Sequence, residues 1–357
     1  MKNLREDLTL LMTDAARRPT LHDVARLSGT SIATASAVLS ETSTKYVSEQ
    51  LQQRVLEAAN RLRYRPNIAA RRMKGKRGKL LAILIPQFEN VFFNRVVIGA
   101  ESYANSAGYI LSIFSTYDRE EKEITFIENL LSMQVDGILI CPANNKSKSV
   151  NMIRKANVPL VVVDRLAEPA TDYDFVAIDN YQAAYEGTRL LLNHGHRKIL
   201  FVGWKSPLNT ITDRVQGFRD AIRDFGADPE DSLVFESERD REAVYRFLLD
   251  SFKNHRFTAI LAALHMLGEG VLQSIQTLNL KIPDDLSVLI YGNPTWASLH
   301  RPPLTCIAQP DLEVGRKAAE LLIDQLENEA HEKTQIILRT ELVTRQSVRY
   351  LERRTIR

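Results

Sequence analysis

The stretch that decides the organisation of this chain is Thr20-Leu-His-Asp-Val-Ala-Arg-Leu-Ser-Gly-Thr-Ser-Ile-Ala-Thr-Ala-Ser-Ala-Val-Leu39. Its apolar spacing predicts a helix over residues 21–27, and Asp23 stands three residues after Thr20, as in a capping box. Gly29 permits a tight turn, because a residue without a Cβ adopts left-handed backbone angles readily. Ser31 then caps a second helix that runs to Leu39. Two short helices around a glycine turn are the layout of a helix-turn-helix.

A third helix and an arginine-rich segment follow. Ser48 is expected to cap a helix from Glu49 to Leu62, and the next residues read Arg61-Leu-Arg-Tyr-Arg-Pro-Asn-Ile-Ala-Ala-Arg-Arg-Met73. Residues 1–79 hold 16 Lys or Arg and 7 Asp or Glu, a net charge of +9, whereas the rest of the chain carries −6. A basic module on an acidic body indicates a polyanionic partner for the module, although a solubilising basic arm has the same composition.

Composition limits the remaining possibilities. With 357 residues, 44% hydrophobic and 25% charged, the chain has the length of two or three soluble domains. It lacks a membrane-length apolar window and a signal-peptide pattern, so we expect a cytoplasmic protein with no membrane partner. Cys141 and Cys306 have no metal-site spacing and fit free thiols in a reducing compartment. Neither a cofactor nor a metal is expected.

From Leu80 onward, short apolar runs alternate with amphipathic helices. This alternation predicts an α/β fold of doubly wound parallel sheets, arranged as two units joined by crossing strands. Strands are expected at 80–85, 109–114, 137–141, 160–163, 198–202, 232–235, 259–263 and 286–290, with a last one near Val343. Helices are expected at 92–107, 120–132, 149–156, 182–194, 214–225, 241–252 and 268–278.

The order of these motifs resembles the lactose-repressor family of bacterial transcription regulators. The headpiece landmarks are Leu21-x-Asp-Val-Ala-x-Leu-Ser-Gly-Thr-Ser31, Thr34-Ala-Ser-Ala-Val-Leu39 and Tyr64-x-Pro-Asn-x-x-Ala-Arg71. The body landmarks include Asp136-Gly137, Val163-Asp-Arg165, Arg214-x-x-Gly-Phe218 and Gln309-Pro310. The resemblance covers residues 19 to 348. It implies a homodimer on a pseudo-palindromic DNA operator, whose affinity a small carbohydrate-like effector controls, most often as a repressor.

The resemblance also implies the domain boundaries. A periplasmic-binding-protein-like body of two lobes would follow an all-α headpiece and a hinge helix. The expected parts are an extension at 1–18, the helix-turn-helix headpiece at 19–66, the hinge helix and linker at 67–78, a first lobe at 79–178 plus about 309–336, and a second lobe at 179–308 plus about 337–357.

DNA contacts are expected from the second helix of the headpiece and from the hinge. In the headpiece the candidates are Leu21, Ser31, Ile32, Ala33, Thr34, Ser36 and Ala37. In the hinge they are Asn67, Ala70, Arg71 and Met73. Met73 stands where the family wedges an apolar side chain into the central base step, although an ordinary linker side chain fits the same sequence. The family usually carries an Arg at position 37, so apolar contact with thymine methyl groups is expected here instead of an Arg fork on guanine.

Effector contacts are expected at the carboxyl ends of the parallel strands, where two facing lobes would enclose a ligand. The candidates are Phe92, Phe93, Ser115, Asp164, Arg165, Arg214, His265 and Asn293. An aromatic face can stack on a ring, and an Arg fork can hold two oxygens. Two alternatives stay open: Phe93 also fits a core position, and Asp164 also fits a cap or an ion pair with Arg165.

The expected cleft departs from the family pattern at two places. The chain has Leu264-His265 where the family commonly has Asn-Asp, and Gly292-Asn293-Pro294 where an acidic pair is usual. Two carboxylates are therefore missing. A neutral sugar stays possible, and a phosphorylated or acidic sugar, a nucleobase or no effector at all become credible alternatives.

Two rival classes fit the sequence poorly. An enzyme would need a nucleophile with its base or a metal cluster, and the chain has no GxSxG, no HExxH and no dense set of His, Cys and Asp. No enzyme is therefore expected. A plain solute-binding protein would not need the basic headpiece.

Overall fold

The computed structural model describes residues 19–39, 46–65, 78–168, 173–237, 240–254 and 257–351. The chain divides into two compact units, residues 1–78 and 79–357. Within the described part, no helix is both long enough and apolar enough to span a bilayer.

The first unit contains the expected three-helix headpiece, α2 (Leu21–Ser28), α3 (Ile32–Val38) and α4 (Glu49–Arg61). A small apolar core holds the helices together, with Val24, Ala35 and Val55 fully buried. The capping box is confirmed: the Thr20 amide donates to Asp23 Oδ2 at 2.8 Å, and the Asp23 amide donates to Thr20 Oγ1 at 3.4 Å.

The turn between α2 and α3 is also the expected one, but the cap of α4 is not. Gly29 has φ of 64°, the left-handed conformation that a glycine adopts without strain. Ser48 occupies the N-cap position of α4, yet its side chain makes no capping hydrogen bond. The prediction that the Ser48 side chain caps this helix is therefore wrong. The Ser48 carbonyl oxygen accepts the Gln52 amide at 3.0 Å, which is the first backbone bond of the helix.

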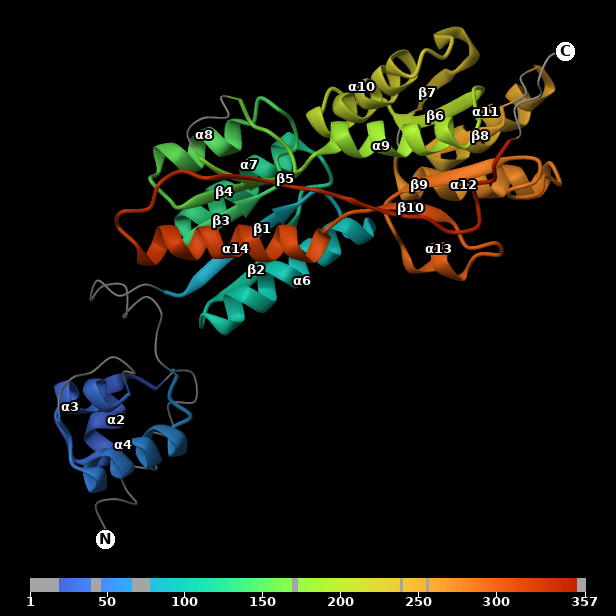
Figure 1. Cartoon of the computed structure of the whole chain (residues 1–357). Helices are drawn as coiled ribbons and strands as arrows, with labels where there is room; N and C mark the ends of the chain where they lie inside the picture. The colour runs from blue at the N-terminus through green and yellow to red at the C-terminus, as the bar shows by residue number, and fades with distance from the viewer. Residues whose placement is uncertain are drawn as a thin grey trace, which may run out of the picture. The chain divides into compact units, whose positions relative to one another are not determined.

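The second unit consists of two lobes, each built on a six-stranded sheet (Figure 1). The first sheet has the order β11-β5-β4-β3-β1-β2, and all its strands are parallel. Its elements are β1 (Leu80–Ile85), α6 (Val91–Ser106), β2 (Ile110–Ser115), α7 (Glu120–Ser132), β3 (Gly137–Ile140), α8 (Lys148–Lys155), β4 (Leu160–Val163), β5 (Asp174–Ile178), α14 (Asp311–Glu327) and β11 (Gln335–Leu338).

The second sheet has the order β12-β10-β9-β8-β6-β7, and only β12 runs antiparallel to its neighbour. Its lobe contains α9 (Asn180–Asn193), β6 (Ile199–Trp204), α10 (Asn209–Asp224), the 3-10 helix η1 (Pro229–Asp231), β7 (Leu233–Ser237), α11 (Arg241–Asn254), β8 (Ala259–Ala262), α12 (His265–Thr277), β9 (Ser287–Tyr291), α13 (Thr295–Leu299), β10 (Thr305–Ala308) and β12 (Glu341–Val343). The predicted fold of doubly wound parallel sheets is confirmed.

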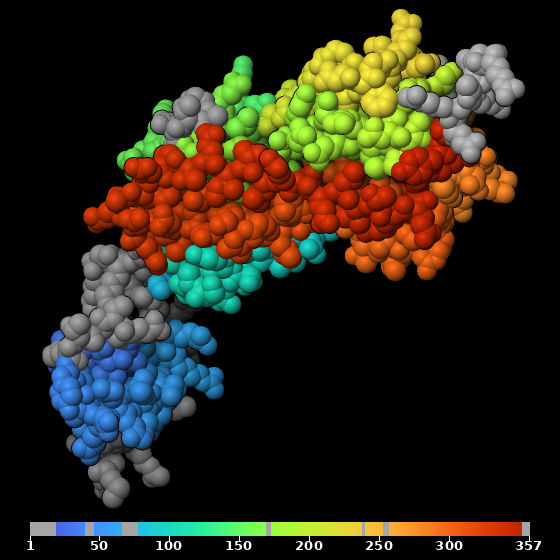
Figure 2. Space-filling model, viewed as in Figure 1, coloured from blue at the N-terminus to red at the C-terminus, as the bar shows by residue number. Residues whose placement is uncertain are grey.

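The chain crosses between the lobes after β5, after β10 and after β11. In Figures 1 and 2 the red C-terminal segment passes along one side of both lobes. Helix α14 thereby returns to the first lobe, where it packs against α6. This packing needs glycine, because a Cβ on Gly315 would stand 1.8 Å from the Val96 carbonyl oxygen.

Three differences from the expected elements concern the cleft between the lobes. The strand β5 was not predicted, although its buried run ends directly before Asp179, the residue that caps α9. Helix α10 begins at Asn209 and not at Arg214, so its first turn faces the cleft. The short strand β10 and the helix α14 after it were also not predicted as elements.

Candidate functional site

The N-terminal end of α3 presents the surface that the sequence assigns to DNA. Ser31 Oγ accepts the Thr34 amide at 3.1 Å and thereby caps the helix, as expected. Ser31, Ile32 and Ala33 are exposed, with Ile32 47% exposed, whereas Ala35 is fully buried in the headpiece core. This end of α3 therefore offers a small, largely apolar surface, without an arginine.

The other predicted DNA contacts are less exposed or lie outside the described residues. Leu21 packs against the headpiece core, and Thr34, Ser36 and Ala37 are half-buried on α3. The hinge candidates Asn67, Ala70, Arg71 and Met73 lie outside the described residues.

In the body, five predicted effector residues come together around one cavity between the lobes. Its volume is about 30 Å³. The first lobe and the crossing segment contribute Asn90, Phe92, Phe93, Asp164, Arg165 and Gln309; the second lobe contributes Trp204, Thr210, Ile211, Arg214 and Leu264. The carboxyl ends of β1, β4, β6 and β8 lead into these residues, which is where a parallel sheet places a ligand.

Arg214 is held firmly at the base of the cavity. Its Nε donates to Asn180 Oδ1 at 2.8 Å, and its Nη1 donates to the Ala263 carbonyl oxygen at 2.7 Å. The guanidinium lies over the ring of Tyr291, at 3.7 Å from the centroid, which is a cation–π arrangement. Burial raises the pKa of Tyr291 to about 12. Arg214 is therefore a fixed positive charge facing the cleft.

Asp164 and Arg165 stand side by side but do not pair with each other. Arg165 Nη1 donates to Asp118 Oδ1 at 2.5 Å and to the Pro142 carbonyl oxygen at 3.1 Å. Asp164 Oδ1 and Arg165 Nε are buried and have no partner. Burial raises the pKa of Asp164, and the positive charges of Arg165 and Arg214 only partly offset it. Buried polar atoms ordinarily have hydrogen-bond partners, so both atoms keep the capacity to bond a further group.

Phe93 occupies the core position that the sequence left open as an alternative, and it lines the cavity as well, as Phe92 does. Phe92 and Phe93 pack edge to face, with ring centroids 5.1 Å apart, and are 6% and 4% exposed. Both belong to the core of the first lobe and also line the cavity. Asn90 positions them, because its Oδ1 accepts the Phe92 amide at 3.0 Å and caps α6.

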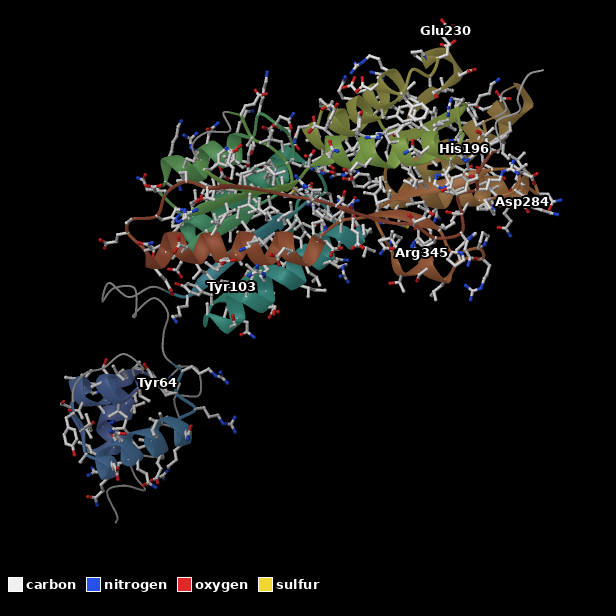
Figure 3. The ribbon with its side chains drawn as sticks, viewed as in Figure 1. Tyr64, Tyr103, His196, Glu230, Asp284 and Arg345 are labelled. Atoms are coloured by element: carbon white, nitrogen blue, oxygen red, sulfur yellow. The ribbon has the colours of Figure 1, made fainter. Side chains whose placement is uncertain are left out.

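Three predicted effector residues do not line this cavity. Ser115 is buried and donates to the Pro86 carbonyl oxygen at 3.2 Å. Asn293 is exposed, and its Oδ1 accepts a hydrogen bond from Arg345 Nη2 at 2.8 Å. Arg345 is the second-lobe residue labelled in Figure 3. His265 is buried next to Leu264, and burial, together with the charge of Arg214, lowers its pKa to about 4. The neutral imidazole of His265 therefore brings no charge to the cleft.

The prediction also missed several residues that do line the cavity. Trp204 ends β6 and Leu264 follows β8, so the rule of strand carboxyl ends applied to every strand would have found both. Thr210 and Ile211 were missed because α10 begins one turn earlier than expected. Gln309 directly follows β10, a strand that was not predicted, and Asn90 gave no clear signal in the sequence.

Direct hydrogen bonds hold the lobes together beside the cavity. Asn145 Nδ2 in the first lobe donates to the Pro207 carbonyl oxygen in the second at 3.0 Å. The Leu166 amide donates to Asn209 Oδ1, also at 3.0 Å. The second-lobe partners, Pro207 and Asn209, lie just before α10 and at its first residue, so a change in lobe angle must break or shift both contacts.

The described residues were also searched for a second pocket and for a metal-binding cluster. A hollow of about 610 Å³ lies against α10 and β7, is lined by largely exposed side chains such as Lys205 and Arg219, and contains none of the predicted residues. No group of three or more His, Cys, Asp or Glu in the described ranges could hold a metal ion.

Comparison with known proteins assigns the chain to a family. Residues 20–67 match the helix-turn-helix of the bacterial regulatory proteins of the lacI family, and residues 78–346 match the periplasmic binding proteins and sugar binding domain of the LacI family. The chain belongs to the LacI family of bacterial DNA-binding transcription regulators.

Relatives in this family are similar over nearly their whole length. The repressor PurR of Vibrio vulnificus is 31% identical over 333 residues, which cover 92% of this chain and 98% of that protein. The regulator RegA of Clostridium saccharobutylicum is 30% identical over 334 residues, with the same coverage.

Solved structures show the same fold. The regulator CelR in complex with cellobiose aligns with a TM-score of 0.69 and 26% identity, covering 92% of this chain and 100% of that one. The lac repressor dimer bound to operator and the anti-inducer ONPF aligns with a TM-score of 0.83 at 22% identity, covering 93% and 100%.

Proposed function

We propose that this regulator represses transcription as a homodimer on a pseudo-palindromic operator, and that a small molecule bound between its lobes controls its affinity for DNA. The convergence of Phe92, Asp164 and Arg214 on one cavity between the lobes carries the proposal. These residues come from three separate segments of two lobes, so a ligand that touches all three senses the angle between the lobes.

The polar atoms of the cavity define what the effector must offer. Asp164 Oδ1 is an unpartnered acceptor and Arg165 Nε an unpartnered donor. A ligand with an N–H or O–H group close to an oxygen or ring nitrogen would satisfy both. The rings of Phe92 and Phe93 favour a flat face or the apolar face of a sugar.

A nucleobase fits this description best. A planar base presents donors and acceptors along one edge and stacks on aromatic rings. A phosphorylated or acidic sugar is the second candidate, because two arginines and one carboxylate line the cavity.

Coupling to DNA follows from lobe closure. The hinge segments precede the first lobe, so in a dimer the lobe angle sets their separation. A ligand shifts this equilibrium only by the difference between its affinities for the open and closed forms. The bonds from Asn145 to Pro207 and from Leu166 to Asn209 are the contacts that such a ligand would strengthen or break.

On the operator, Ile32 and Ala33 at the start of α3 would contact thymine methyl groups in the major groove, and Met73 would enter the minor groove between base steps. Two hinge segments must pair for this, which is why we propose a homodimer. A mass measurement by sedimentation with operator DNA checks it, and a single chain per operator would contradict it.

The DNA part of the proposal is tested by selecting bound fragments from a genomic DNA pool. The affinity of the protein is then measured for the selected site and for a scrambled duplex. We expect tight binding to the selected site that weakens steeply with salt.

A thermal-shift panel of guanine, hypoxanthine, ribose, cellobiose, glucose 6-phosphate and glucuronate tests the effector part. If none of these compounds stabilises the protein or changes its operator affinity, control by such an effector is refuted. The DNA-binding part is decided separately, by the comparison of the selected site with the scrambled duplex.

A further inference from the structure

The first strand of the body connects the linker with the cavity. Lys79 is the first residue of the second unit, and Leu80 begins β1. Residues 81–85 of this strand are buried, and Asn90 and Phe92, which line the cavity, follow its carboxyl end. Its six residues span roughly 20 Å, so the linker joins the body at the end of β1 that is opposite the cavity. Contacts at the start of β1 therefore determine how the linker leaves the body.

Asp136 holds the start of β1 through both its side chain and its backbone. Its Oδ2 atom accepts the Leu80 amide at 2.7 Å, and its own amide donates to the Leu80 carbonyl oxygen at 2.8 Å. Asp136 stands directly before β3, which is paired with β1. The backbone bond forms with any residue at position 136. The bond from the Leu80 amide, in contrast, requires a side chain with an acceptor.

Lys79 is held by the strand on the other side of β1. Its carbonyl oxygen accepts the amide of Ile110, the first residue of β2, at 2.9 Å. Its ammonium group lies 5.5 Å from the ring centroid of Tyr109, a cation–π contact. Lys79 has φ of 58°, which is unfavourable for a residue with a Cβ and persists where the surrounding contacts enforce it. The chain thus enters the body through a turn that its neighbours fix.

We propose that Asp136 is a positioning residue for operator binding. By bonding the Leu80 amide, it fixes the point and the direction in which the linker leaves the body, at the far end of β1 from the effector cavity. The inference rests on the proposed function, because it concerns how the body holds the hinge segments that must pair on the operator.

The proposal predicts a selective loss of affinity. Without an acceptor at position 136, the first residues of the second unit gain freedom in the unbound protein. They must be ordered again when two hinge segments pair on the operator, and ordering a backbone opposes binding. Binding to a scrambled duplex depends on phosphate contacts and needs no hinge pairing, so it should not change.

The chain offers a matched control at the start of β4. Gln325 of α14 accepts the Leu160 amide through Oε1 at 3.1 Å and donates to the Leu160 carbonyl oxygen through Nε2 at 2.9 Å. Leu160 is the first residue of β4, a strand of the same sheet that is not joined to the linker. If Asp136 only stabilised the first lobe, loss of either side chain would affect operator binding alike.

The test measures the affinity of the wild type, Asp136→Ala, Asp136→Asn and Gln325→Ala for the selected operator and for a scrambled duplex. We expect Asp136→Ala to bind the operator roughly tenfold more weakly, equivalent to about 1.4 kcal/mol, with no change on the scrambled duplex. Asp136→Asn should bind as the wild type, because its amide oxygen can accept the Leu80 amide. Gln325→Ala should also bind as the wild type.

Four results would each overturn the inference. They are an operator affinity of Asp136→Ala equal to that of the wild type, an equal loss in Gln325→Ala, an equal loss in Asp136→Asn, and equal losses on both duplexes. A further variant does not depend on how well Asp136→Ala folds. Two glycines inserted between Gly78 and Lys79 give the linker the same freedom without changing the body. This variant should also lose affinity for the operator alone, and unchanged operator binding contradicts the proposal.

Hydrogen exchange of the free protein tests the physical cause. Peptides that contain residues 79–82 should exchange faster in Asp136→Ala than in the wild type or in Gln325→Ala, because the start of β1 opens more often. Equal exchange in all three proteins refutes the role of Asp136. Neither experiment uses an effector, so effector control is not at issue in them. If the wild type prefers the selected site and these tests fail, only the inference falls; if the wild type shows no such preference, the proposed function falls and the inference with it.

Discussion

The guanidinium of Arg214 and the hydroxyl of Tyr291 share one acceptor, the Oδ1 atom of Asn180, with both hydrogen bonds at 2.8 Å. The three residues come from α10, β9 and α9, three elements of the second lobe. The cluster therefore fixes the start of α10 against the sheet beneath the cleft. A ligand that contacts Arg214 acts on a rigid part of the lobe and not on a loose side chain.

Arg214→Ala should lower both effector affinity and the stability of the body. The substitution leaves the Ala263 carbonyl oxygen without its donor, and hydrogen bonds to a charged group contribute roughly 1.5–3 kcal/mol each. Urea unfolding and titration with a compound from the effector panel measure the two effects. Arg219→Ala is the control, because Arg219 is an exposed residue of the same helix. Effector binding to Arg214→Ala that matches the wild type would show that the site lies elsewhere.

Thr20→Ala should destabilise the headpiece by about 1 kcal/mol, the usual contribution of an N-cap side chain. The residue loses the reciprocal hydrogen bonds that Thr20 and Asp23 make at the start of α2. Ser48→Ala should have little effect, because Ser48 holds the N-cap position of α4 without a capping bond. Thermal unfolding of the headpiece in the full chain, followed by calorimetry, compares the two variants. An equal loss in both would contradict the capping assignment.

Stability should depend on pH through His331. Burial alone would lower the pKa of this imidazole, but its hydrogen bonds to Asp324 and Asp174, at 2.5 and 2.9 Å, outweigh burial and raise it. A raised pKa in the folded state means that the charged form stabilises the fold. This contribution is complete below the unfolded pKa, about 6.5, and is lost as pH rises through the higher folded pKa.

Melting temperatures of the wild type and His331→Gln between about pH 5 and pH 9 check this sign. The difference between the two proteins should be largest at the acid end and should shrink as the pH rises. A difference that grows toward alkaline pH would show that His331 is not the stabilising cation.

Met73→Gly should weaken binding to the operator far more than binding to a scrambled duplex. A wedge acts only on a site that bends around it, whereas phosphate contacts form on any sequence. Lys74→Ala is the control, since removing a phosphate contact should weaken binding to both duplexes alike. Equal losses on both duplexes for Met73→Gly would contradict the wedge.

Local patterns were sufficient for the headpiece and for most of the body. The capping box at Thr20, the left-handed Gly29 and the alternation of apolar runs with amphipathic helices depend on neighbours within a few residues, so the sequence shows them directly. Ser48 is the instructive exception. Its residue type suits an N-cap, but residue type alone does not fix the side-chain rotamer that makes or misses the bond.

The sequence by itself determined the class of the protein, the two largely parallel sheets and five of the residues around the cavity, because strand carboxyl ends can be located along the chain. Only the tertiary structure decided what those ends enclose. Asn293 follows β9, but its side chain bonds to Arg345 at the surface. Trp204, the last residue of β6, lines the cavity between the lobes. Asp164 stands beside Arg165, yet Arg165 bonds to Asp118, 47 residues earlier in the chain. These side-chain contacts join segments that are far apart in the sequence. A local sequence pattern carries no information about the distance between such segments in the folded chain.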